Sequence, residues 1–200
     1  MGRKKKRYLD MEARWERARR RNLVDARPGR HSCILVLDHL KPDFNIGKIF
    51  RSGDAFGVRE IHLVGVDMFD PEPAKGSVRW VPFVCHQDFS SCYRDISGRG
   101  YAMFALEPDG ESLLTTTTFP ARSAFILGHE EFGISFDRGR FPGVGSLSIP
   151  QWGQVQSLNV SVAASIVLYE YIRQHGIPDP DRVMKTDNRH GRDSDDQTSA

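Results

Sequence analysis

Cysteine is scarce in this chain of 200 residues, which contains only Cys33, Cys85 and Cys92. The three residues show neither CxxC spacing nor a Cys/His cluster, so the sequence supports neither a disulfide framework nor a zinc site. A reducing cytoplasm is the simplest compartment for such a chain. We therefore expect a cytoplasmic protein without a bound metal.

Long apolar runs are also missing. No run approaches the roughly 20 residues of a membrane-spanning helix, and the basic N-terminus lacks the apolar segment of a signal peptide. The composition, 39% hydrophobic and 27% charged, is ordinary for a globular protein of one domain with tails. These features exclude a membrane partner from the expected functions.

The phosphate-binding loops of common nucleotide enzymes are absent too. No GxGxxG follows a predicted strand, and no Walker lysine loop is present. This absence weakens the assignment of a dinucleotide or ATP enzyme.

Positive charge is concentrated at the N-terminus. Residues 1–30 hold 12 Lys or Arg against 4 Asp or Glu, a net charge of +8, which leaves −6 for the other 170 residues because the whole chain carries +2. Residues 11–22 (MEARWERARRRN) are expected to form a helix whose arginines can pair with RNA phosphates. The alternative is a merely solvated extension.

Apolar strand-like segments then alternate with helix-like ones. The predicted strands are residues 32–37, 60–66, 80–84, 101–106, 124–127 and 147–149, and the predicted helices between them are residues 46–56 and 88–97. Asn45 can cap the first helix, Gly57 can end it in the left-handed conformation, and Pro82 suggests an edge strand. This order predicts an α/β fold with a mainly parallel sheet flanked by helices.

The stretch 149–171 (IPQWGQVQSLNVSVAASIVLYEY) joins an amide-rich loop to a helix. Apolar residues recur at helical spacing from about Ser157, Gln156 or Ser157 can cap the first turn, and Gly176 can mark the end. Such a cluster of polar groups at a helix N-terminus suits a ligand rich in hydrogen-bonding groups, although a capped core helix with a polar lead-in loop remains the alternative. Residues 177–200 are polar and expected to be disordered.

Polar side chains gather where three of these predicted strands end. Asn45 with Arg51, Glu130 after Gly128, and Ser157 with Asn159 are expected to converge on one edge of the sheet. Active sites of parallel α/β folds are usually built at this edge.

These same segments resemble the three motifs of the SpoU/TrmH family of RNA ribose 2'-O-methyltransferases, in the SPOUT superfamily. The motifs correspond to residues 45–58 (NIGKIFRSGDAFGV), 125–135 (FILGHEEFGIS) and 148–170 (SIPQWGQVQSLNVSVAASIVLYE). Their order and spacing agree with the family, and the resemblance covers roughly residues 30–175. It is closest to the TrmH type, which modifies a guanosine in the D-loop of tRNA.

The resemblance implies a deep C-terminal trefoil knot and a homodimer, with the last helix at the interface. Ala163, Ala164 and Ser165 would permit close helix packing there. It also implies that S-adenosyl-L-methionine is bound by the loops after the strands and by the start of the last helix. The implied cofactor residues are Leu106, Leu127, Gly128, Ile149 and Leu158.

Family analogy makes Arg51 the central catalytic residue. A guanidinium rarely gives up its proton, so the alternative to a general base is a group that holds phosphate and stabilises the developing alkoxide. Asn45 is a helix cap, an active-site residue or both, and Glu130 organises the knot loop or the partner's arginine unless it is a surface carboxylate. Ser157 and Asn159 either shape the cofactor and substrate sites or only cap the helix. Neither Glu131 nor His129 is assigned a role.

The expected function is S-adenosylmethionine-dependent methylation of a ribose 2'-hydroxyl in structured RNA, with tRNA favoured and rRNA possible. Residues 1–30 are expected to be a basic RNA-binding extension, residues 31–176 the methyltransferase domain, and residues 177–200 a tail. The competing hypotheses are a non-catalytic RNA-binding protein with the same fold and a metabolic α/β enzyme with a nucleotide cofactor.

Overall fold

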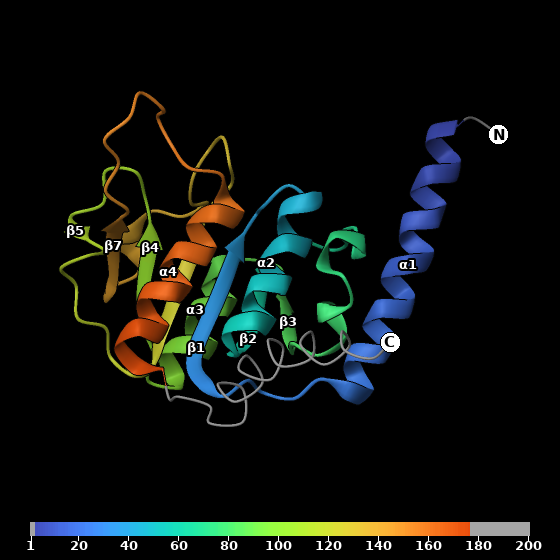
Figure 1. The fold of residues 1–200 in the computed structure, drawn as a ribbon, viewed down its shortest axis with the longest axis horizontal. Helices are drawn as coiled ribbons and strands as arrows, with labels where there is room; N and C mark the ends of the chain where they lie inside the picture. The colour runs from blue at the N-terminus through green and yellow to red at the C-terminus, as the bar shows by residue number, and fades with distance from the viewer. Residues whose placement is uncertain (1–2, 177–200) are drawn as a thin grey trace, which may run out of the picture.

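Seven strands form one sheet in the order β3-β2-β1-β6-β4-β7-β5, and every strand pairing within it is parallel (Figure 1). The computed structural model describes residues 3–176, with side chains from residue 8 onward. The strands are β1 His31–Asp38, β2 Val58–Val64, β3 Phe83–His86, β4 Ala102–Leu106, β5 Ser112–Leu113, β6 Ser123–Leu127 and β7 Val144–Ser148. The predicted parallel α/β sheet is therefore confirmed, and the predicted tail, residues 177–200, lies outside the described residues.

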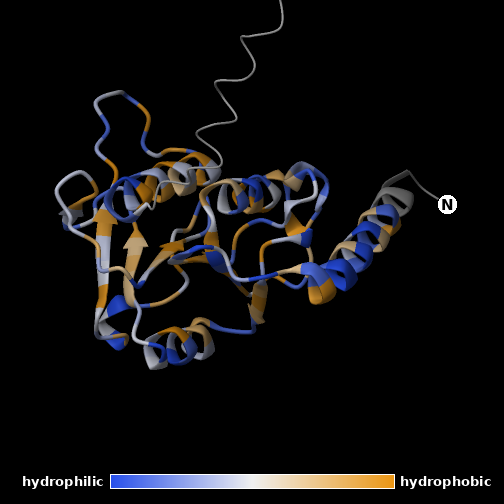
Figure 2. Cartoon of the chain, turned by 60° about the horizontal axis from the view of Figure 1, so that its bottom comes forward, coloured by the Kyte–Doolittle hydropathy of each residue, from blue (hydrophilic) through white to orange (hydrophobic). Residues whose placement is uncertain are grey.

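Helices cover both faces of this sheet. Helices α2 and α4 lie on one face and α3 on the other, while α1 stands at the side of the body (Figures 1 and 2). The α-helices are α1 Arg3–Asp25, α2 Phe44–Phe56, α3 Phe89–Gly98 and α4 Val160–His175, and short 3₁₀ helices span η1 Glu72–Ala74, η2 Ser77–Arg79 and η3 Arg138–Arg140. Within residues 3–176, no helix is both long enough and apolar enough to cross a membrane.

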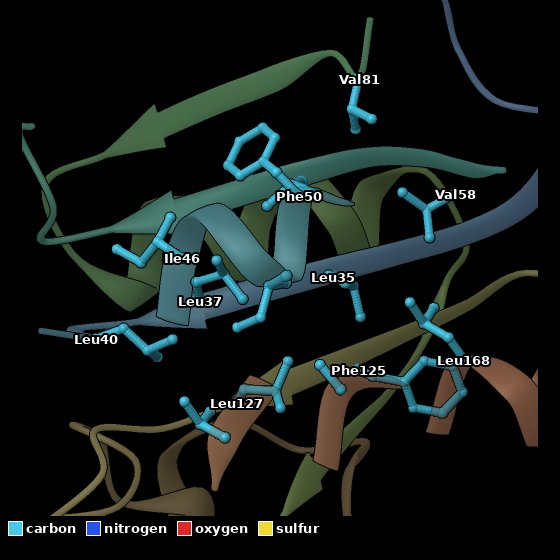
Figure 3. Packing of buried hydrophobic residues seen from close by; sticks show 14 of the residues in the cluster. Leu35, Leu37, Leu40, Ile46, Phe50, Val58, Val81, Phe125, Leu127 and Leu168 are labelled. Carbon is cyan, nitrogen blue, oxygen red and sulfur yellow. The ribbon is translucent and has the colours of Figure 1, made fainter. Parts of the chain in front are cut away.

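The central strand β1 contributes to the hydrophobic core on both faces. Leu35 and Leu37 pack on the α2 and α4 side, whereas Ile34 and Val36 pack on the α3 side. Successive strand residues point to opposite faces, so a strand covered on both faces needs a continuous apolar run. Figure 3 shows the first of these two layers, where Leu35 and Leu37 lie near Phe50 of α2.

Two helix starts differ from the prediction. Helix α2 begins at Phe44 and is capped by Asp43, whose carboxylate accepts the Asn45 N–H, so Asn45 is not the cap. Helix α4 begins at Val160 and is capped by Asn159 rather than by Gln156 or Ser157. In both places an Asp or Asn closest to the first turn satisfies a free N–H group. Gly57 ends α2 in the left-handed conformation, as predicted, with φ +64°.

Strand β3 also lies elsewhere than predicted. It spans Phe83–His86 instead of residues 80–84, because the Trp80 N–H bonds to the Ser77 carbonyl as η2 closes and Pro82 then precedes the first ladder pair. β3 is an edge strand, as Pro82 suggested. The two-residue strand β5 was missed, since two residues carry no periodic pattern.

Helix α1 is longer than the predicted residues 11–22 and is anchored by one aromatic side chain. Trp15 is buried, with its ring 4.7 Å from that of Phe69 and 5.5 Å from that of Phe83. Asn22 adds hydrogen bonds from Nδ2 to the carbonyls of Val78 and Val81, at 2.6 and 2.8 Å. The basic segment is therefore fixed to the chain between β2 and β3.

Candidate active site

A cavity of about 470 Å³ opens at the carboxyl ends of β4, β6 and β7. Its volume lies within the range of small-molecule sites in proteins. The five residues predicted to hold a cofactor all line it, together with parts of the loop before α4 and one residue of α4 itself: Leu106, Leu127, Gly128, Ile149 and Leu158, with Gln151, Gln156, Ser157 and Asn159 of the loop and Ala163 of the helix. The ends of β4, β6 and β7 thus form one concave site at the edge of the sheet where parallel α/β folds bind ligands.

The loop after β6 approaches its own backbone closely at Gly128. A Cβ atom there would lie 2.3 Å from the carbonyl carbon of Gly133, so only glycine fits. Reciprocal backbone hydrogen bonds between His129 and Gly133, 2.8 and 2.9 Å long, hold this turn. The Nδ1 atom of His129 accepts the N–H groups of Glu131 and Phe132, so the imidazole is engaged within the loop.

Asp38, a residue without a predicted role, fixes the far end of the same loop. Its carboxylate is fully buried at the end of β1 and accepts the Ser135 N–H at 2.6 Å and the Ser135 hydroxyl at 2.8 Å. The ring of His39 lies 2.8 Å away on the other side. Ionised acceptors make the stronger hydrogen bonds of proteins. An aspartate that closes an apolar strand was the only sequence signal for this role.

Asn45, Glu130 and Asn159 meet at the rim of the cavity. Asn45 donates from Nδ2 to Oε1 of Glu130 at 2.8 Å, and Asn159 donates from Nδ2 to Oδ1 of Asn45 at 3.2 Å. Asn159 also accepts the Ser161 N–H and hydroxyl, so it caps α4 while it contacts α2. The structure therefore brings together one predicted residue from each motif.

Glu130 is held in its ionised form. Partial burial raises the pKa of its carboxyl, but hydrogen bonds from Asn45 and from the backbone N–H groups of Glu130 and Lys41 outweigh burial and lower it below the usual range. Its neighbour Glu131 is exposed and pairs with Lys41 at 3.4 Å. The rim of the cavity thus carries a fixed negative charge.

Arg51 and Ser157 stand apart from this network. Arg51 is exposed and lines a second hollow of about 470 Å³ between α2 and α4, and its guanidinium makes no hydrogen bond or ion pair with the described side chains, those of residues 8–176. Ser52 and Ser165 join the two helices in this hollow through a 2.8 Å hydroxyl contact. Ser157 is exposed and lines the first cavity.

The three small residues of α4 face different surroundings. Ala164 is fully buried in the core and Ser165 contacts α2, while Ala163 lines the cavity. Exposed apolar surface on this helix comes instead from Val162 and Tyr169, whose exposed fractions are 46% and 64%.

The loop before α4 carries two notable side chains. Gln151 has a buried Oε1 atom without a hydrogen-bond partner among the described residues, and the residue lines the cavity. A buried unpaired acceptor is costly unless a ligand or water satisfies it. Trp152 is 91% exposed beside it. The cavity wall therefore combines apolar side chains with polar ones, and Gln151 Oε1 leaves one hydrogen-bond acceptor open for a ligand.

Known proteins are similar in sequence to this chain over most of its length. It is similar to the tRNA (guanosine(18)-2'-O)-methyltransferase of Thermus thermophilus, with 34% identity over 170 residues that cover 82% of this chain and 86% of that protein. It is also similar to the 23S rRNA (guanosine-2'-O-)-methyltransferase RlmB of Nitrosomonas europaea, with 33% identity over 147 residues. That match covers 71% of this chain and 56% of the relative.

Solved structures agree with these relatives in fold. The TrmH/SpoU tRNA modifying enzyme of A. aeolicus superposes with a TM-score of 0.66 at 26% identity, covering 86% of each chain. The AdoMet bound rRNA methyltransferase from Sinorhizobium meliloti also gives a TM-score of 0.66, at 28% identity, and the match covers 76% of this chain and 59% of that one. The family model described as "SpoU rRNA Methylase family" matches residues 32–169, which include the first two motifs and all but the last residue of the third. The chain therefore belongs to the SpoU rRNA methylase family.

Proposed function

We propose that this protein transfers a methyl group from S-adenosylmethionine to a ribose 2'-hydroxyl of RNA. The observation that carries the proposal is one cavity shared by the carboxyl ends of β4, β6 and β7, with Asn45, Glu130 and Asn159 joined by hydrogen bonds at its rim. Family membership and the 2'-O-methyltransferase names of both relatives support the reaction type.

The cavity residues fit the cofactor. Leu106, Leu127 and Leu158 offer apolar surface for its adenine and methylene groups, and the unpaired Gln151 Oε1 offers an acceptor for its amine or hydroxyl donors. The absence of a side chain at Gly128 lets the backbone approach closely. When bound, S-adenosylmethionine supplies a strongly electrophilic sulfonium methyl group, so the protein has mainly to position the ribose oxygen.

Arg51 is proposed to hold the RNA phosphate next to the reacting hydroxyl. Its exposed guanidinium can bind phosphate through two parallel N–H groups and stabilise the alkoxide that forms as the proton leaves. A guanidinium is a poor general base. Asn45 and Asn159 are proposed to orient the ribose, with the ionised Glu130 holding Asn45 in place.

A homodimer would bring Arg51 to the cavity of the partner subunit. Within one chain Arg51 lines a different hollow from Glu130, the hydrogen-bond partner of Asn45, so these residues do not share one cavity. The exposed Val162 and Tyr169 give α4 an apolar surface beside that hollow, as a symmetric interface requires.

The deep trefoil knot of the family is proposed for this chain as well. Tyr171 donates from Oη to the Ala121 carbonyl at 2.5 Å, and Gln174 contacts Phe119 and Thr117, so the loop before β6 lies against the end of α4. This contact is the one expected where α4 passes through a loop of the chain. Single-molecule extension from both termini would stop short of the full contour length if the chain is knotted.

The basic helix α1 is proposed to bind RNA in the cytoplasm. Arg17, Arg19, Arg20 and Arg21 are exposed, and among the side chains that the structure describes, from residue 8 to residue 176, they have no ion-pair partner. Charges of this kind bind phosphates with release of counterions. We propose tRNA in preference to rRNA, because the tRNA-modifying relative is matched over 86% of its length and the rRNA-modifying relative over 56%.

The test is methyl transfer from tritiated S-adenosylmethionine to tRNA and rRNA taken from a strain that lacks the gene, followed by mapping of 2'-O-methyl positions. The proposal predicts stoichiometric methylation of one ribose position, in tRNA. Specific methylation of rRNA alone would overturn the substrate choice. Cofactor and RNA binding without methylation would favour the non-catalytic alternative, and binding of NAD or ATP alone would contradict the reaction class.

A further inference from the structure

A histidine and cysteine cluster lies on the α3 face of the sheet, away from the candidate active site. His62 of β2, His86 at the end of β3 and Cys92 of α3 each offer one ligand atom, and all three atoms lie within 4.8 Å of one another. None of these residues lines the candidate active-site cavity. The cluster therefore has no part in the function proposed above.

Two of the separations measured from His62 Nδ1 are close to those between ligand atoms in a tetrahedral metal site. Cys92 Sγ lies 3.8 Å and Asp95 Oδ2 lies 3.9 Å from His62 Nδ1, and Asp95 is one helical turn beyond Cys92. Zinc bonds of about 2.0–2.3 Å in a tetrahedron place ligand atoms roughly 3.3–3.6 Å apart. The third distance from His62 Nδ1, to His86 Nε2, is 2.8 Å and has to open by about 0.5 Å to admit an ion between them. Asp95 lies outside the group of three whose ligand atoms are all within 4.8 Å of one another, and its Oδ1 lies 3.6 Å from Arg99 Nη1, so its side chain has to turn toward His86 and Cys92 to become the fourth ligand.

The carboxylate of Glu60 orients the buried histidine for this role. Nε2 of His62 lies 3.0 Å from Oε1 of Glu60, and that oxygen also contacts Arg99 Nη1 at 2.5 Å. Because His62 donates its Nε2 proton to Glu60, its Nδ1 lone pair points toward His86 and Cys92. Metal-binding histidines usually donate their other N–H to a carboxylate or carbonyl in this way.

We propose that His62, His86, Cys92 and Asp95 bind one Zn²⁺ ion as a structural site. The mixture of imidazole, thiolate and carboxylate ligands suits zinc, and four protein ligands leave no open position for catalysis. On binding, the Cys92 thiol releases its proton to solvent, and the charges of thiolate and carboxylate balance the ion. The ion would tie the short edge strand β3 and helix α3 to β2. The four residues come from three elements and form no compact sequence motif, so this proposal departs from the metal-free protein that the cysteine spacing predicted.

The test uses the full-length protein, freed of metal with a chelator and then titrated with Co²⁺ and with Zn²⁺. Co²⁺ should bind one to one, with a thiolate charge-transfer band and the intense visible bands of four-coordination, and Zn²⁺ should displace it. Stoichiometric Zn²⁺ should survive desalting and raise the melting temperature. A folded protein that gives no thiolate band, or loses Zn²⁺ on desalting, would overturn the proposal.

Matched variants locate the site. Cys92→Ala should abolish the charge-transfer band, and His86→Gln, at a half-buried position, should weaken Co²⁺ binding at least tenfold while the fold is kept. Cys85→Ser is the control, because Cys85 is exposed and adjacent to His86 yet outside the cluster. Retention of the band in Cys92→Ala, or its loss in Cys85→Ser, would contradict the assignment.

Discussion

Asn45 and Glu130 are 85 residues apart in the sequence and are joined by a 2.8 Å hydrogen bond from Nδ2 to Oε1. This bond connects the first turn of α2 to the loop after β6, and Asn159 extends it to the start of α4. The three motifs of the sequence therefore meet through side chains at one rim of one cavity.

Asn45→Ala should lower methyl-transfer turnover about 10²-fold, since small displacements of positioning groups have effects of this size. Steady-state kinetics with saturating S-adenosylmethionine measure it. Asp43→Ala is the matched control, because it removes the cap of the same helix and should cost about 1 kcal/mol of stability with turnover nearly unchanged. Equal losses of turnover in both variants would show that Asn45 acts only through the helix.

Gly128→Ala should weaken S-adenosylmethionine binding at least about tenfold, or about 1.4 kcal/mol. The added methyl group meets the Gly133 backbone, so the loop that lines the cavity has to move. Calorimetric titration measures the dissociation constant. Gly153→Ala, where a Cβ atom meets nothing within 4 Å, should bind the cofactor normally, and normal binding by Gly128→Ala would refute the role of the loop.

Glu130→Gln should reduce stability in a pH-dependent way. The folded pKa of Glu130 is lowered chiefly by the hydrogen bonds that outweigh its partial burial, so the folded state binds its proton less readily than the unfolded state. The stabilisation is therefore complete above the unfolded pKa of about 4.3 and is lost as the pH falls through the lower folded pKa. Urea unfolding at several pH values measures it. If the difference in unfolding free energy between wild type and variant grew as the pH fell, this prediction would be wrong.

Mixing two inactive variants should restore activity if each site draws on both chains. Arg51→Ala and Glu130→Ala subunits, refolded together, form mixed dimers in which one site keeps both wild-type groups. Each variant refolded alone should remain inactive, which provides the control. Absence of recovery in a mixture shown to contain mixed dimers would place Arg51 and Glu130 in the same subunit's site.

Much of the fold could be predicted because its signals are local. The buried run before Asp38 identified β1, and Gly57 ended α2 where its lack of a side chain was needed. The prediction that Asn45 caps α2 was wrong for a reason that is not local. Asn45 has the right chemistry for a cap, but its side chain bonds to Glu130, and Asp43 takes the free N–H.

The sequence could predict which residues belong to the site, but not which of them contact one another. The sequence predicted that Arg51 and Ser157 would converge with Asn45, Glu130 and Asn159. The structure joins only the last three through hydrogen bonds, and nothing in the sequence showed that Arg51 lines a separate hollow. The Asp38 and Ser135 contact spans 97 residues, and a pairing at that distance is created only by the order of the strands.

The kinetics of Arg51→Ala test the central claim most directly, with cofactor affinity measured on the same preparation. Turnover on RNA should fall at least about 10²-fold, as for loss of a group that stabilises developing charge, while the dissociation constant for S-adenosylmethionine stays within about twofold. Arg51→Lys should recover only part of the rate, because an ammonium cannot bind phosphate through two parallel N–H groups. Unchanged turnover, or a parallel loss of cofactor binding, would contradict the assignment of Arg51 to the reacting ribose.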